Sequence, residues 1–117
     1  MTTLSVSVPV IEANIARYGL TGFCRRVRAA DVPVLELEAN PESAARYVTQ
    51  EACDAADQDG IDCVILGCAG MVAVTEQVKA ALSCPVIEPV EAAARCLGFV
   101  SNTPSTRLEL PISKNKA

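Results

Sequence analysis

The feature that most constrains the fold is a short apolar run, residues 61–66, which reads I-D-C-V-I-L between two glycines. A β-branched and apolar run of this length is typical of a strand buried on both faces of a parallel sheet. Residues 8–18, 44–55 and 74–82 carry apolar side chains at helical spacing, and residues 85–87 form a second short run. This alternation predicts an α/β fold, a small parallel sheet flanked by helices, with the 61–66 strand at its centre.

Capping and breaking residues suggest where the elements begin and end. Ser7 and Asn40 are placed to cap two helices that have proline in their first turn. A short strand with solvated arginines is expected at 25–29, whereas residues 32–37 are ambiguous between strand and helix. A third helix is expected over residues 89–100, and the carboxylates at its start, Glu88 and Glu91, are expected to cap it or to face its positive end.

Length and composition bound the possible functions. The chain has 117 residues, of which 50% are hydrophobic and only 3% aromatic, so the core is expected to be aliphatic. One domain over residues 1–100 and a polar tail over 101–117 are predicted. The net charge of −4 argues against nucleic acid or a membrane surface as a partner. The longest uncharged apolar stretch, 63–74, is short for a bilayer span, and a cytoplasmic location is expected.

Six cysteines and no histidine restrict the possible chemistry. The cysteines form no C-x-x-C pair, which weakens the case for a zinc site, and a Ser-His or Cys-His catalytic pair within this chain is excluded. Five of them are expected to be reduced thiols that pack mostly as small core side chains: Cys24, Cys53, Cys63, Cys84 and Cys96.

The sixth, Cys68, lies in the run Gly67-Cys68-Ala69-Gly70, directly after the predicted central strand. Ligands of open α/β sheets bind beyond the carboxyl ends of strands. Small residues there let backbone N–H groups approach a ligand, and a helix expected to begin near Met71 would direct its positive end at the loop. That field favours a thiolate at Cys68, able to act as nucleophile or general base. A tight turn with a packed apolar Cys68 would explain the same pattern, and spacing alone does not decide.

Two longer runs add a resemblance to a known family. Residues 64–71 (V-I-L-G-C-A-G-M) and 85–93 (P-V-I-E-P-V-E-A-A) resemble the second half of hydantoin racemases, in the aspartate/glutamate racemase superfamily. Shorter stretches that also resemble this family are residues 1–4, 8–12, 16–20 and 34–37.

The resemblance implies a cofactor-independent isomerase without a metal, which racemises hydantoins or related amino-acid derivatives between two similar α/β domains. One cysteine from each domain faces the stereocentre, so that one thiolate removes the Cα proton and the other thiol delivers a proton to the opposite face. Cys68 matches the second-domain cysteine. The other residues that match expected substrate contacts are Gly67, Ala69 and Gly70, as backbone donors to the developing oxyanion, and Thr2 and Thr3, at the cleft edge.

The departure from the family pattern bears on function. The first domain, with its cysteine, has no counterpart in this sequence, and neither does the strand expected before Met1. The sheet is therefore expected to have an unpaired edge, and the apolar face that includes Leu97 and Phe99 is expected to lack its cover. A homodimer with two Cys68 thiols across one cleft, or a second chain, would complete the site.

Two other functions stay open. In the first, a single cysteine protonates a planar enolate, as in the decarboxylases of the superfamily. In the second, the chain is a non-catalytic truncated remnant or a module that binds a small anion.

Overall fold

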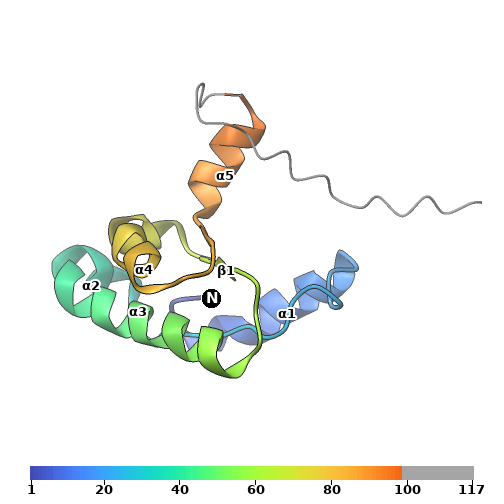
Figure 1. The fold of residues 1–117 in the computed structure, drawn as a ribbon, viewed down its shortest axis with the longest axis horizontal. Coiled ribbons are helices and arrows are strands. Elements are labelled where there is room, and N and C mark those ends of the chain that lie inside the picture. The colour runs from blue at the N-terminus through green and yellow to red at the C-terminus, as the bar shows by residue number, and fades with distance from the viewer. Residues whose placement is uncertain (99–117) are drawn as a thin grey trace, which may run out of the picture.

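The computed structural model describes residues 1–98 and confirms the small α/β architecture (Figure 1). In chain order the elements are η1 (Ser5–Ser7), α1 (Val8–Arg17), α2 (Val34–Ala39), α3 (Pro41–Gln58), β1 (Val64–Ile65), η2 (Ala69–Val74), α4 (Thr75–Ala81), β2 (Val86–Ile87) and α5 (Pro89–Cys96). The elements written η are 3-10 helices. The predicted tail, 101–117, lies outside the described residues.

The sheet is built from short parallel segments. β1 and β2 pair in parallel, with Val64 opposite Val86 and Ile65 opposite Ile87. On the other side of β1 lies the amino-terminal segment, where the Met1 carbonyl accepts a hydrogen bond of 2.6 Å from the Gly67 N–H. This segment in turn pairs in parallel with Ala29 through Thr2. β1 is therefore an inner strand, as expected, between the amino-terminal segment and β2.

The core lies between one face of this sheet and a layer of helices. Val64 and Leu66 are buried against α2, α3, η2 and α4, which gather on one side of the molecule in Figure 1. The largest fully buried side chains are Leu37, Leu66, Met71, Val48, Val74 and Val78. All are aliphatic or thioether side chains, which confirms the aliphatic core expected from the composition.

The other face of β1 corrects a prediction. Ile65 points away from the core and is 55% exposed, so the expectation of a strand buried on both faces is wrong. The physical reason is that no helix within residues 1–98 covers Ile65. Neither α1 nor α5 has a buried residue, and both stand apart from the α2–α4 layer in Figure 1. The strand itself is also shorter than residues 61–66.

Several predicted element boundaries change. Residues 25–29 contribute only the Ala29 bridge instead of a strand, and the ambiguous 32–37 segment becomes α2. Ser7 and Asn40 stand at the expected helix starts, but neither side chain caps the helix. The Asn40 amide donates instead to Glu36 at 2.7 Å.

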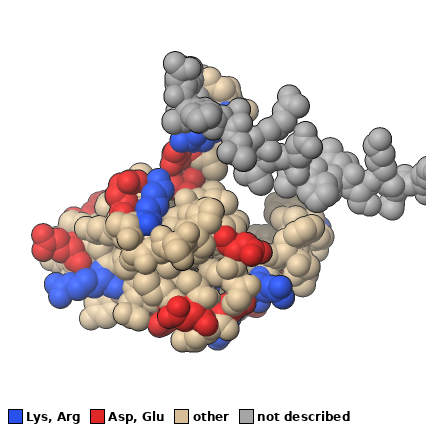
Figure 2. Space-filling view, viewed as in Figure 1, with Lys and Arg blue, Asp and Glu red and all other residues tan. Residues whose placement is uncertain are grey.

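Arg28, which was expected to face solvent, instead forms ion pairs with two carboxylates. Its guanidinium donates to Asp59 at 2.5 and 2.9 Å and to Glu51 at 2.8 Å, and both carboxylates lie on or just after α3. These contacts raise the pKa of Arg28 and lower that of Asp59. Elsewhere acidic and basic side chains are interspersed on the visible surface (Figure 2). Within residues 1–98, no helix has the length and apolar character that crossing a membrane requires.

Candidate functional site

The loop that follows β1 approaches the amino-terminal segment closely. A Cβ on Gly67 would stand 2.8 Å from the Met1 carbonyl oxygen, a separation that real Cβ atoms do not tolerate. The Gly67 N–H uses this proximity to donate to the same oxygen. Glycine is therefore required at position 67 by the contact between two neighbouring sheet segments, and the loop is held at the carboxyl edge of the sheet.

Cys68 is a free, partly buried thiol at the head of η2. Its backbone is extended, and its carbonyl accepts the N–H of Met71 at 3.0 Å. A Cβ placed on Gly70 would lie 3.6 Å from the Cys68 sulfur and 3.2 Å from Leu37 Cδ1. The thiol thus lies beside a glycine that allows α2 to pack closely on the loop. Sequence reasoning missed this role of α2, because a six-residue helix after Pro33 gives little periodic signal.

The helix after the loop differs from the expected one. The chain enters η2 at Ala69 and becomes α-helical only at Thr75, so no α-helix begins near Met71. Among the described residues, the N–H groups of Ala69 and Gly70 have no protein acceptor, as is usual in the first turn of a helix. The loop therefore presents two unsatisfied backbone donors next to the Cys68 residue, although the short 3-10 turn provides a weaker dipole than an α-helix.

The remaining cysteines lie elsewhere in the fold. Cys63 precedes β1 and Cys84 precedes β2, which places both toward the amino ends of the strands, while Cys53 lies on α3. All six cysteines are free, and Cys96, expected to pack in the core, is exposed. Cys68 lies three residues after Ile65, the last residue of β1, and it is the one cysteine of the chain in a loop just beyond the carboxyl end of a strand in the described sheet.

The other predicted site residues are near this edge but differ in accessibility. Thr2 and Thr3 are 4% and 5% exposed, so both are enclosed by the sheet and its neighbours. Ala69 and Gly67 are exposed, and Gly70 is partly buried. Glu88, buried after β2, accepts the N–H groups of Val90 at 3.0 Å and Glu91 at 2.6 Å. Its expected role as a helix cap is confirmed.

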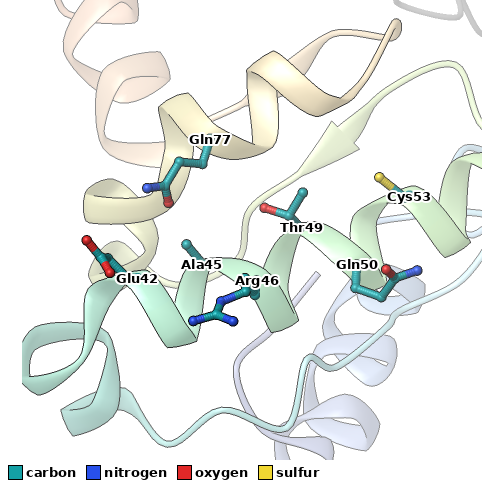
Figure 3. Close-up of a pocket in the computed structure, with 7 residues that line it drawn as sticks. All are labelled: Glu42, Ala45, Arg46, Thr49, Gln50, Cys53 and Gln77. Carbon is teal, nitrogen blue, oxygen red and sulfur yellow. The ribbon is translucent and has the colours of Figure 1, made fainter.

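A surface groove lies away from the Cys68 loop. A groove of about 540 Å³ runs between α3 and α4, and Figure 3 shows Gln77 on one wall and α3 side chains on the other. Its lining residues are Glu42, Ala45, Arg46, Thr49, Gln50, Cys53 and Gln77. None of them belongs to the Cys68 loop, so the groove and the candidate site are separate features.

The fold and the loop together define an α/β domain with a free thiol at the carboxyl edge of a parallel sheet. A family model described as Asp/Glu/Hydantoin racemase matches residues 1–97, and the chain belongs to this family. Hydantoin racemases from Rhizobium meliloti and Paenarthrobacter aurescens are 43% identical over 95 residues and 33% identical over 81 residues, which are 81% and 69% of this chain. The resemblance inferred from the sequence is confirmed.

Solved structures agree with this assignment. An allantoin racemase from Pseudomonas fluorescens superimposes with a TM-score of 0.78 and 36% identity, over 84% of this chain. An allantoin racemase from Klebsiella pneumoniae gives a TM-score of 0.77 and 32% identity, over the same share.

The chain spans well under half of these relatives. It covers 39% and 34% of the two hydantoin racemases, and 42% and 40% of the two allantoin racemase chains.

Proposed function

We propose that this chain supplies one half of a cofactor-independent racemase for hydantoin-type or related amino-acid derivatives, with Cys68 as one of two acid/base groups. The observation that carries the proposal is the position of Cys68, which alone among six cysteines lies in the loop just beyond the carboxyl end of a strand of the described sheet. The names of the relatives support the substrate class, because hydantoin and allantoin are both five-membered cyclic ureides.

The chemistry suits a thiol and backbone donors. The Cα–H of a 5-substituted hydantoin is adjacent to a ring carbonyl, so a Cys68 thiolate can accept the proton while the C–H electron pair moves into the carbonyl and forms an enolate. The N–H groups of Ala69 and Gly70, which have no protein acceptor among the described residues, are available to stabilise the oxyanion. Return of a proton to the opposite face completes the inversion.

Inversion by two bases requires an acid on the second face of the substrate. No second cysteine stands beside Cys68 at the carboxyl edge of the described sheet. We propose that the second group lies outside the described residues, either in a second copy of this chain or in the part of the enzyme that this chain does not span. With Cys68 alone, proton exchange would occur on one face and configuration would be retained.

Proton NMR in deuterated buffer tests the proposal. A racemisable 5-substituted hydantoin and allantoin are each incubated with this chain, alone and mixed with the portion of the Rhizobium meliloti hydantoin racemase that lies outside the match. We expect the Cα–H signal to disappear in the mixture, to persist with Cys68→Ala, and to disappear normally with Cys96→Ala, the matched control at an exposed cysteine.

Optical rotation of the same samples separates the mechanisms. Exchange with loss of optical purity supports the two-base reaction, whereas exchange without inversion assigns one-base chemistry to Cys68 and contradicts racemisation. Exchange that survives in Cys68→Ala would remove the thiol from the mechanism. No exchange by a folded mixture would favour a non-catalytic role, and circular dichroism reports whether each chain is folded.

A further inference from the structure

The orientation of the Cys68 thiol depends on packing. Within residues 1–98 the Cys68 sulfur has no hydrogen-bond partner. The Cys68 backbone is extended, with φ −137° and ψ 129°, and an extended backbone admits more than one common χ1 rotamer. A general base must hold its reacting atom within hydrogen-bond reach of the proton that it removes. Neighbouring side chains therefore have to select the rotamer that proton transfer needs.

The side chains that surround the thiol come from α2. Cys68 packs on the hydrophobic core, of which Leu37 is a member. A Cβ placed on Gly70 would have three side-chain atoms around it: Leu37 Cδ1 at 3.2 Å, Val34 Cγ1 at 3.5 Å and Cys68 Sγ at 3.6 Å. The sulfur and the two α2 side chains therefore meet around the space beside Gly70, and both α2 neighbours are aliphatic.

The two α2 side chains differ in what else they do. Val34 and Leu37 are three residues apart on α2, so they share a face, and α2 packs on η2. Leu37 is 1% exposed and belongs to the core, whereas Val34 is 43% exposed. A substitution at Leu37 would disturb the core as well as the thiol. Val34 is therefore the position at which the surroundings of the thiol can be changed while the core stays intact.

We propose that Val34 is a positioning residue for the candidate reaction: its methyl groups, together with Leu37, hold the Cys68 thiol in one rotamer by apolar packing beside Gly70. This inference rests on the proposed function, because the rotamer matters for catalysis only if the thiol exchanges a proton with the substrate. Val34 acts through the sulfur and not on the reacting atoms. Its effect is therefore expected in kcat and not in KM.

NMR of the 117-residue chain tests the positioning without any assay of activity. In the unmodified chain we expect nuclear Overhauser effects between the Val34 methyl protons and the Cys68 Hβ protons. Val34→Ala removes two methyl groups, so the Hα–Hβ couplings of Cys68 should move towards the rotamer-averaged value. Val34→Ile keeps both γ carbons and should restore the couplings of the parent chain. Leu35→Ala, at the adjacent α2 residue, which is 77% exposed, is the matched control.

Two results of this experiment would overturn the proposal. The first is the absence of the Val34–Cys68 Overhauser effects, which is measured in the unmodified chain and does not depend on whether a variant folds. The second is an unchanged set of Cys68 couplings in a Val34→Ala chain that circular dichroism shows to be folded.

Kinetics separate this role from the proposed function. In the mixture with the unmatched portion of the Rhizobium meliloti hydantoin racemase, Val34→Ala should lower kcat for Cα–H exchange roughly 2- to 10-fold at unchanged KM, and Val34→Ile should restore it. A raised KM at unchanged kcat would place Val34 against the substrate and overturn the proposal. Exchange at the parent kcat in Val34→Ala would reject only the positioning role. Averaged Cys68 couplings without exchange in the parent mixture would reject only the proposed function.

Discussion

The two faces of the sheet differ sharply in how they are covered. One face is packed by α2, α3, η2 and α4, and its contact residues Leu66, Val48 and Met71 are fully buried. On the other face, the Ile65 side chain is largely exposed. The two helices outside the packed layer, α1 and α5, contain no buried residue. A parallel sheet normally has both faces covered. The comparison teaches that the fold of this chain is anchored by one layer, while the opposite face remains a surface where further polypeptide can pack.

The largest expected effect on stability comes from comparing substitutions at two adjacent residues, one on each face. Leu66→Ala should lower the free energy of unfolding by about 2–5 kcal/mol, because it removes a fully buried side chain from the core. Ile65→Ala should change it by less than about 0.5 kcal/mol, since its side chain is largely exposed. Urea denaturation of both variants gives the two values. Equal losses would mean that the Ile65 face is covered in solution.

A second pair tests the close contact that holds the candidate site to the sheet. Gly67→Ala should destabilise the chain by roughly 1–3 kcal/mol, because the new methyl group would collide with the Met1 carbonyl at 2.8 Å. Gly22→Ala is the control: a Cβ there meets nothing within 4 Å, and the change should stay within about 0.5 kcal/mol. Thermal unfolding of the two proteins measures this difference, and an unaffected Gly67→Ala would show that the contact is not formed.

The sequence predicted the covered face better than the open one. The run 61–66 located the inner strand and the candidate loop, because apolar β-branched residues and flanking glycines are local signals. The same run wrongly predicted that Ile65 is buried, because the pattern shows that a residue is apolar but not whether a helix covers it. Arg28 was also misjudged, because its partners Glu51 and Asp59 lie 23 and 31 residues away and only the folded chain brings them together.

The candidate site was predicted only in part. The small residues of the Gly67–Gly70 loop and its place after a strand were visible in the sequence. The contact of Gly67 with Met1, and of Gly70 with Leu37, depends on chain segments far apart, which no local pattern encodes. Thr2 and Thr3 remain predicted substrate contacts, although both are buried in this chain.

The ion pair at the end of α3 gives a pH-dependent test of the packed layer. Hydrogen bonds from Arg28 hold the pKa of Asp59 below its ordinary value of 3.8. A lowered pKa in the folded state means that the unfolded chain binds the proton more readily, so this contribution is complete above pH 3.8 and is lost as the pH falls through the folded value. Acid titration followed by circular dichroism should show Asp59→Asn to be less stable at neutral pH, with a weaker acid-induced loss.

Asp57→Asn, at an exposed neighbour, is the control and should keep the acid transition of the parent chain. An unchanged acid transition in Asp59→Asn would mean that the Arg28 pair does not connect the sheet to α3 in solution.

The smallest expected effect concerns α5, a helix outside the packed layer, and is local. Glu88 accepts two backbone N–H groups at the start of α5, so Glu88→Ala should destabilise that helix by about 1 kcal/mol. Because α5 has no buried residue, the loss should appear as faster amide exchange in α5 and not as a lower midpoint of global unfolding. Glu42→Ala, in the first turn of α3, is the control and should leave exchange in α5 unchanged. A lower global midpoint for Glu88→Ala would show that α5 unfolds together with the packed layer, and α5 would then have to be counted with that layer.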